Sequence, residues 1–250
     1  MKRIASLVLL VASALSLACG SRGREDPILR LSAVESLSEG KRLLAGEKYR
    51  QARPYLQHAF EVEPNSATGR EALLLVADSL YQEGGDTNLI QAEAKYRDFQ
   101  NRFPTSDQAA YVQAQIAASL AKRIERPDRD QETTHKALEA YQDLARLYPT
   151  SPLASGAQSE LERVRVNLAE HEDLVGRFYL RFGLPKAAAD RFEGLLVNYP
   201  EYRSKDRVLF DLAAAYRRLK RADDAQATVQ RLRQEYPQSS WIKRLPKEAR

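Results

Sequence analysis

The sequence predicts an all-α repeat solenoid, and three observations carry that prediction. Apolar residues recur at helical spacing, as in the stripe formed by Val208, Leu212, Ala215 and Leu219. Proline-centred breaks return at broadly regular intervals along the chain. No convincing run of strand-type alternation interrupts the pattern. Since a helix pair cannot bury its own apolar stripe, stacking of successive pairs is expected to form the core.

The composition limits the chemistry that the chain can perform. Its 250 residues are 43% hydrophobic and 29% charged, which allows a buried core and argues against wholesale disorder. One cysteine excludes an intramolecular disulfide framework and a cysteine-cluster metal site. His58, His135 and His171 lie far apart without metal-ligand spacing, and we expect them on helix surfaces. We therefore predict no metal and no cofactor.

The first 18 residues have the pattern of an export signal. Lys2 and Arg3 form a short positive start, and an uncharged, mostly apolar run of 15 residues follows from Ile4 to Ala18. A bilayer-spanning helix needs about 20 apolar residues, so the run suits a cleaved signal peptide better. Removing Lys2 and Arg3 lowers the 39 basic residues to 37, against 34 acidic ones. That mildly basic balance does not predict nucleic-acid binding.

The segment Leu15-Ser16-Leu17-Ala18-Cys19-Gly20 resembles a bacterial lipobox, although Ser16 stands where leucine is usual. We predict that Cys19 carries a diacylglycerol and an N-linked acyl chain, which together hold a protein on a membrane. The alternative is an ordinary cleaved signal that leaves a free cysteine. Gly20 replaces the aspartate that retains many lipoproteins in the inner membrane. An outer-membrane location on the periplasmic face is therefore expected, with residues 19–30 as a tether.

Five proline-centred breaks divide the rest of the chain into five expected helix pairs. Proline cannot continue a helix, and a serine or threonine just beyond it can cap the next one. The prolines are 40, 45, 51 and 37 residues apart and are Pro64, Pro104, Pro149, Pro200 and Pro237. The expected solenoid covers residues 31–240, with pairs at 31–66, 67–106, 107–151, 152–202 and 203–239.

The spacing of small and aromatic residues matches the tetratricopeptide pattern of 34 residues per helix pair. Gly176, Tyr179, Ala188 and Phe192 lie 24, 21, 12 and 8 positions before Pro200. Small residues let the two helices of a pair approach closely, and aromatic residues fill the hollow between pairs. The longer intervals require insertions, which we place in a loop at 124–130 and in a lengthened helix within 153–182.

Two basic clusters fall outside the repeat pattern. The tail, residues 241–250, is expected to stay solvated and keep the last repeat soluble, or to touch anionic headgroups or an acidic partner. Its cations are Lys243, Arg244, Lys247 and Arg250. The second cluster is expected to be a solvated helix face and turn, although it also fits the rim of an interface. It consists of Arg217, Arg218, Lys220 and Arg221.

Motifs between residues 126 and 200 resemble the BamD family. The first motif is Arg129-Asp130-Gln131, followed later by Tyr148-Pro149. The second consists of residues 167–172 and 175–180, and the third is Arg191-Phe192-Glu193-Gly194. BamD is the five-repeat tetratricopeptide lipoprotein of the BAM complex, the machine that inserts β-barrel proteins into the bacterial outer membrane. The expected helix pairs, the lipobox and the length agree with it. The resemblance implies a scaffold and not an enzyme.

The resemblance also implies partners. The C-terminal repeats would bind the membrane-proximal POTRA domain of a BamA-like barrel subunit, with Arg191 pairing with an acid there and Glu193 in the same segment. An exposed helix arginine without that role is the alternative for Arg191. Arg129 and Asp130 either shape their loop or contact a partner. Accessory lipoproteins are a further implied partner.

In the family the N-terminal repeats receive the C-terminal signal of unfolded outer-membrane proteins. Tyr49, Tyr55 and Tyr81 are candidates for lining such a groove, or they fill space between helices. The alternative function is a tetratricopeptide lipoprotein of another envelope machine, such as a secretin pilotin or a coordinator of cell-wall synthesis. An enzyme is disfavoured because no nucleophile or carboxylate constellation is recognisable.

Overall fold

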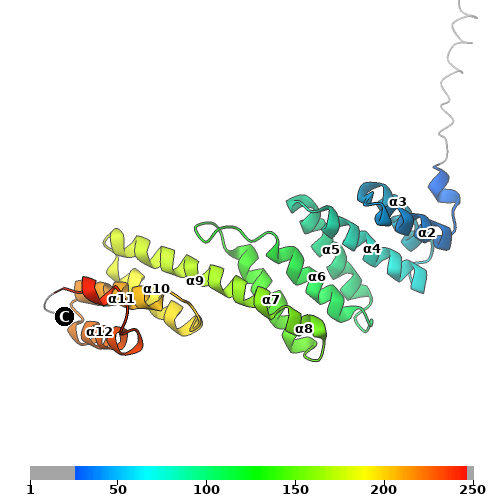
Figure 1. Cartoon of the computed structure of the whole chain (residues 1–250). Helices are drawn as coiled ribbons and strands as arrows, with labels where there is room; N and C mark the ends of the chain where they lie inside the picture. Colours follow the sequence, from blue (N-terminus) through cyan, green and yellow to red (C-terminus); the bar gives the residue numbers. More distant parts are fainter. Residues whose placement is uncertain (1–25, 247–250) are drawn as a thin grey trace, which may run out of the picture. The chain divides into compact units, whose positions relative to one another are not determined.

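The computed structural model describes residues 26–246, and every regular element in this range is a helix (Figure 1). The all-α tetratricopeptide solenoid class is confirmed. The predicted signal peptide, Cys19 and the last four residues lie outside the described range. The helices are η2 (Pro27–Arg30), α2 (Ala33–Ala45), α3 (Tyr49–Val62), α4 (Ala67–Glu83), α5 (Asp86–Arg102), α6 (Ala109–Ala121), α7 (Glu132–Leu147), α8 (Pro152–Gly156), α9 (Gln158–Arg181), α10 (Pro185–Asn198), α11 (Lys205–Arg218), α12 (Ala222–Glu235) and η3 (Ile242–Arg244). The chain divides into two compact units, Met1–Ala72 and Leu73–Arg250.

The first unit contains the helix pair α2 and α3, which pack on each other. A capping box starts α2: Ser32 Oγ accepts from the Glu35 backbone N–H at 3.3 Å, and Glu35 Oε2 accepts from the Ser32 N–H at 2.9 Å. The two helices approach closely at Gly40, where an added Cβ would lie 2.5 Å from Leu56 Cδ2. A small residue is therefore required on α2 at this point.

The expected surface position of His58 is wrong. The residue is only 8% exposed on α3, and its Nε2 lies 3.0 Å from the carbonyl oxygen of Leu31. That contact ties the segment before α2 to α3. The carbonyl supplies the polar partner that a buried imidazole needs, so His58 has a packing role. His135 is exposed as expected, and His171 is half-buried.

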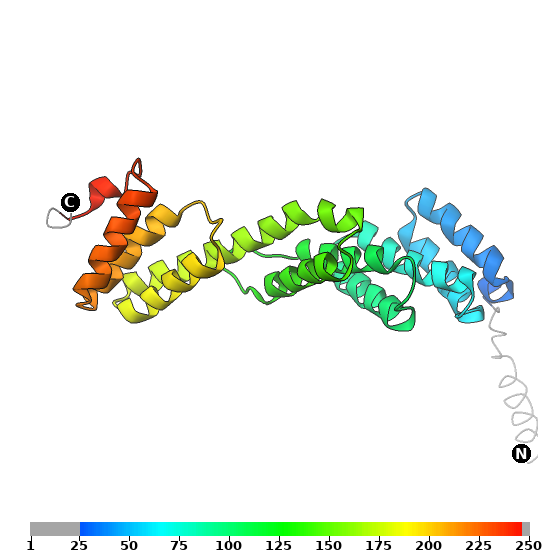
Figure 2. The same ribbon diagram turned by 90° about the horizontal axis from the view of Figure 1, so that it is seen from below.

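In the second unit, helices pack largely in chain order (Figure 2). Contacts join α5 to α6, α6 to α7, α7 to α9, α9 to α10, α10 to α11, and α11 to α12. Each junction has large buried side chains, among them Tyr96, Ile116, Leu144, Phe192 and Leu209. Stacking of neighbours therefore buries the apolar stripes, as a solenoid requires.

The longest proline interval, from Pro149 to Pro200, contains α8, α9 and α10. Ser151 Oγ accepts from the Leu153 N–H at 3.2 Å and caps α8, which ends at Gly156. The helix predicted within 153–182 is therefore interrupted at Ala157, after which α9 continues for 24 residues. The other predicted insertion lies in the loop between α6 and α7.

A close approach joins α9 to α10. A Cβ added to Gly176 would lie 2.5 to 2.9 Å from three atoms of the Phe192 ring, which is fully buried. Gly183 then turns the chain into α10. Its φ of +77° is a backbone conformation that glycine adopts without steric cost. The small residue and the aromatic residue of the repeat pattern are thus the two sides of one contact.

Buried charges join α9 to the helix pair that follows. Asp173 is 1% exposed, and its Oδ2 accepts hydrogen bonds from the Tyr202 hydroxyl at 3.1 Å and from the Arg207 guanidinium. Arg177 Nε lies 3.4 Å from Asp173 Oδ1. Burial, followed by repulsion from Asp173, raises the pKa of Asp211 to about 6, while Arg207 and Arg177 oppose the rise. The charge of this junction therefore changes with pH.

Gly176→Ala is expected to destabilise the protein by about 1–2 kcal/mol, because overpacking against a buried ring outweighs the better helix propensity of alanine. Gly194→Ala is the matched control in α10, since nothing lies within 4 Å of its added Cβ. It should stabilise by about 0.5–1 kcal/mol. Urea unfolding followed by circular dichroism measures both. Equal effects of the two variants would contradict the close approach.

Asp211→Asn is expected to stabilise the protein at pH 7 by on the order of 1 kcal/mol after solvent screening. With a raised pKa, the folded state binds more protons than the unfolded state between about pH 4 and 6. The contribution of Asp211 to stability is therefore present at low pH and lost as the pH rises through 6. The difference in unfolding free energy between variant and wild type should grow over that range. A constant difference would contradict the shifted pKa.

Candidate partner-binding surface

Arg191 lies on α10 and forms an ion pair with α9. Its Nη1 donates to Oε1 and Oε2 of Glu172, each at 3.0 Å, while the arginine side chain stays 43% exposed. The hydrogen bond to Glu172 raises the pKa of Arg191. A guanidinium has five N–H donors, so an ion pair made through one nitrogen leaves donors for a further carboxylate. Glu172 orients the arginine at a surface that a partner can reach.

Glu193 points to a different neighbour. Its Oε1 accepts a hydrogen bond from the Tyr216 hydroxyl on α11 at 2.6 Å. Burial and this bond raise the pKa of Tyr216 to about 12. Arg191 and Glu193 therefore face α9 and α11 respectively, and the structure does not bring their side chains to one point. Within the chain, Glu193 joins α10 to α11.

The loop between α6 and α7 is held against α9. His171 Nδ1 lies 2.7 Å from the Pro127 carbonyl oxygen, and Asn167 Nδ2 donates to the Glu125 carbonyl at 3.1 Å. Asn167 and His171 are one helical turn apart, so together they fix the loop along one side of α9. Sequence reasoning missed this role, because each histidine was considered only as a metal ligand or a surface residue.

Arg129 and Asp130 lie in this loop, and both are exposed. Asp130 Oδ1 accepts from the Glu132 N–H at 2.9 Å at the start of α7. The Arg129 carbonyl accepts from Gln131 Nε2 at 3.0 Å. The loop-shaping interpretation therefore accounts for the Asp130 carboxylate and the Arg129 backbone. The Arg129 side chain remains available at the surface.

Tyr81 lies beside a charged and aromatic cluster in the second unit. Lys122 Nζ stands 3.8 Å from the centre of the Tyr81 ring. Nearby, Asp78 Oδ1 accepts from the hydroxyls of Tyr96 at 2.7 Å and Tyr111 at 2.8 Å. Burial raises the pKa of Asp78, although both hydroxyl bonds oppose that rise. This cluster was not foreseen, since its members are far apart in sequence.

Tyr49 and Tyr55 belong to the first unit, where both lie on α3 and are half-buried. Tyr81 belongs to the second unit and is also half-buried. The three rings therefore do not form one site within either unit. The contacts of Tyr81 are therefore described separately from those of Tyr49 and Tyr55.

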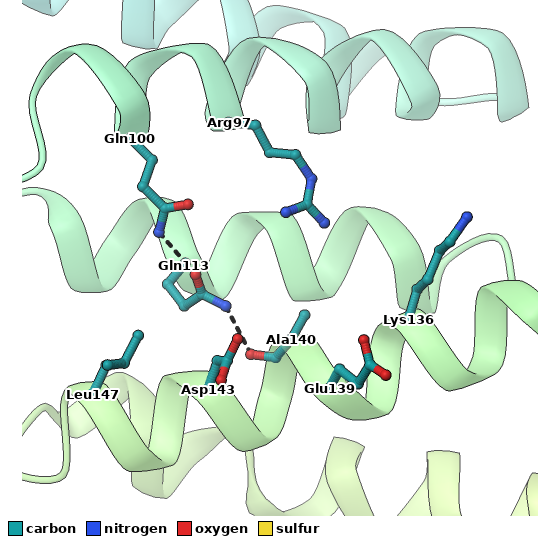
Figure 3. Close-up of a pocket in the computed structure, with 8 residues that line it drawn as sticks. All are labelled: Arg97, Gln100, Gln113, Lys136, Glu139, Ala140, Asp143 and Leu147. Carbon is teal, nitrogen blue, oxygen red and sulfur yellow. Dashed lines mark hydrogen bonds between the residues drawn. The ribbon is translucent and has the colours of Figure 1, made fainter.

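A hollow of about 230 Å³ opens between α5, α6 and α7 (Figure 3). Gln100 Nε2 donates to Gln113 Oε1 at 2.9 Å, and Gln113 Nε2 donates to the Ala140 carbonyl at 2.9 Å. The charged residues around these amides have both signs and are Arg97, Lys136, Glu139 and Asp143. The mixed charges favour neither an anionic nor a cationic ligand, so we do not assign this hollow to a site.

The described part of the tail packs on the last repeat. Leu245 is 1% exposed and lies against Ala213 and Val229. The guanidinium of Arg244 lies 4.4 Å from the centre of the Trp241 ring. The expectation of a solvated tail is therefore wrong for Leu245, because this apolar residue covers the end of the core. Lys247 and Arg250 lie outside the described range.

Residues 26–246 offer no metal centre and no membrane span. They contain no group of three or more His, Cys, Asp or Glu side chains placed to hold a metal ion. None of the helices among these residues combines the length and the apolar character needed to cross a bilayer.

Comparison with known proteins identifies the family. The sequence profile of the YfiO family, described as "Outer membrane lipoprotein", matches residues 31–232. The chain is 27% identical to the outer membrane protein assembly factor BamD of Haemophilus influenzae, covering 88% of this chain and 86% of that protein. It is 26% identical to the BamD of Rickettsia prowazekii, covering 89% and 88%. The BamD of Neisseria gonorrhoeae is 25% identical, with 94% and 93% covered.

Among solved structures, the chain resembles the TPR2AB domain of yeast Sti1, with a TM-score of 0.40 and 20% identity over 82% of this chain and 78% of that one. A tetratricopeptide protein of Thermus thermophilus gives a TM-score of 0.36 and 18% identity over 85% and 96%. The profile match covers most of the sequence, including both units. The chain therefore belongs to the YfiO family of outer membrane lipoproteins.

Proposed function

We propose that the protein is the lipid-anchored scaffold of the machine that inserts β-barrel proteins into the outer membrane. The family match and the three BamD relatives support outer-membrane protein assembly as its role. The predicted acylation of Cys19 supplies the anchor and places the helical repeats on the periplasmic side. The protein acts by binding other polypeptides and catalyses no reaction of its own.

The partner of the C-terminal repeats is the POTRA-bearing barrel subunit. The observation that supports this most directly is the exposed Arg191, which Glu172 orients through one guanidinium nitrogen. A carboxylate on the POTRA domain binds the remaining donors. Glu172 already offsets part of the guanidinium charge of Arg191. The contact between Arg191 and the POTRA carboxylate therefore adds most binding free energy where it excludes water. The exposed Arg129 side chain is a second candidate contact.

Unfolded outer-membrane proteins are the proposed clients of the N-terminal repeats. In the second unit, Tyr81 and Lys122 present an aromatic ring and a cation together, which suits a polypeptide segment with aromatic side chains and a terminal carboxylate. Tyr49 and Tyr55 are the corresponding candidates in the first unit. Accessory lipoproteins are a third class of partner.

Depletion of the protein is expected to lower the amount of folded β-barrel proteins in the outer membrane, and wild-type chain supplied in trans should restore it. Barrel content is measured by heat-modifiable mobility in gels.

A radioactive fatty acid should label the wild type but not Cys19→Ser, which lacks the acceptor sulfur. Normal barrel levels in depleted cells would reject the function. Label in Cys19→Ser would reject only the anchor.

Arg191→Glu is expected to weaken capture of the POTRA-bearing subunit by about 2–5 kcal/mol, or at least about thirty-fold in Kd, if the contact is desolvated. The variant places two acids side by side where an ion pair stood. Arg231→Glu is the control, since Arg231 on α12 is 47% exposed and pairs with Glu235. Circular dichroism should show equal helicity in both variants. Unaltered capture by Arg191→Glu would remove this residue from the interface.

A further inference from the structure

The turn between α9 and α10 exposes apolar side chains that the fold does not use. Phe178 is 55% exposed, Phe182 is 61% exposed and Leu184 is 50% exposed. The rings of Phe178 and Phe182 lie 4.5 Å apart, so they form one continuous apolar surface. Gly183 reverses the chain between Phe182 and Leu184, which makes these residues the protruding end of a helix pair.

The turn between α11 and α12 lies beside this apolar tip. Arg218, near the end of α11, donates from Nη1 to the Leu180 carbonyl, near the end of α9. Figure 2 shows the two turns, yellow and orange, at the same edge of the second unit. The basic cluster of the last repeat therefore borders the exposed phenylalanines, and the two features form one surface.

Cations outnumber acids on this surface. Arg181, Arg217 and Lys220 form no ion pair within residues 26–246, while Arg218 donates only to a carbonyl. The acids nearby are mostly engaged: Lys186 pairs with Asp190 at 3.2 Å, and Arg221 pairs with Asp224 at 2.7 Å. Asp223 lies at the N-terminal end of α12, where the helix dipole stabilises its charge.

We propose that this edge, formed by the apolar tip and the cations around it, contacts an anionic phospholipid surface. Protruding aromatic and aliphatic side chains beside arginine and lysine are the combination that binds at a membrane interface, where rings enter the acyl boundary and cations meet phosphates. The inference rests on the proposed function only because that function holds the chain at a membrane. A tethered chain meets the lipid at high effective concentration, so a modest contact suffices.

A protein partner fits these observations less well. The apolar residues lie on a protruding turn and not in a concave pocket, and protein hot spots favour packed, enclosed pockets. The surplus cations match the phosphates of an anionic bilayer, which offers many equivalent ligands and needs no shape complementarity. The surface is also distinct from Arg191, whose pair with Glu172 lies between α9 and α10.

The test uses the full chain reconstituted into vesicles of phosphatidylethanolamine and phosphatidylglycerol with brominated acyl chains, which quench tryptophan at the interface. Trp241, the single tryptophan, is first replaced by phenylalanine. Phe182→Trp in that background places the reporter at the tip. Val197→Trp is the control, because Val197 is 77% exposed near the opposite end of α10.

The tryptophan fluorescence of Phe182→Trp should be at least about two-fold lower in the brominated vesicles than in the same vesicles without bromine. Interfacial side chains lie ~5–10 Å into the headgroup boundary, within reach of the quencher. The control should be unquenched. The quenching should weaken in zwitterionic phosphatidylcholine vesicles and in the Arg181→Gln, Lys220→Gln double variant. Equal quenching at both positions, or none at Phe182→Trp, would overturn the proposal.

A protein-docking surface is the remaining outcome. It would appear as an unquenched Phe182→Trp whose emission shifts to the blue when the purified POTRA-bearing subunit is added, and it would also overturn the membrane contact. Capture of that subunit through Arg191 is measured separately. Failure of the lipid contact is therefore distinguishable from failure of the proposed function.

Discussion

The structure depends on the close approach of two helices at a residue without a side chain. In the second unit, Gly176 on α9 leaves room for the buried ring of Phe192 on α10, and in the first unit Gly40 on α2 makes the same room for Leu56 on α3. Once a pair is held at this distance, the outer faces of its helices are placed for stacking on the neighbouring pair. Within the second unit, the core then continues from one helix to its neighbour in the chain.

The positions of the candidate site residues on α10 follow from that packing. Because α10 lies tightly against α9, Arg191 reaches Glu172, and because α11 packs on the other side, Glu193 reaches Tyr216. Two residues of one short motif thus serve different purposes. Arg191 is paired with Glu172 at an exposed position, and Glu193 joins two helices of the solenoid.

The fold class could be predicted because repetition makes each signal appear several times. Glycine, alanine, aromatic residue and proline recur at fixed offsets, so one ambiguous position matters little. The polar contacts could not be predicted in the same way. Glu172 is 19 residues from Arg191, and His58 is 27 residues from Leu31. Which polar atoms meet across a junction depends on the rotation of each helix, and the spacing of apolar residues defines that rotation only coarsely. The contacts of Asp130 were easier to anticipate, because helix starts have local rules.

The two amides between α5, α6 and α7 restrict how this part of the solenoid can deform. Gln113 is 5% exposed, accepts from Gln100 on one side and donates to the Ala140 carbonyl on the other. Sliding of α6 along either neighbour would leave a buried amide without its bond, at a cost of about 1–3 kcal/mol. These three helices therefore resist shear as a single stiff block. A change of curvature by sliding therefore costs more at α6 than at a junction without such a buried amide.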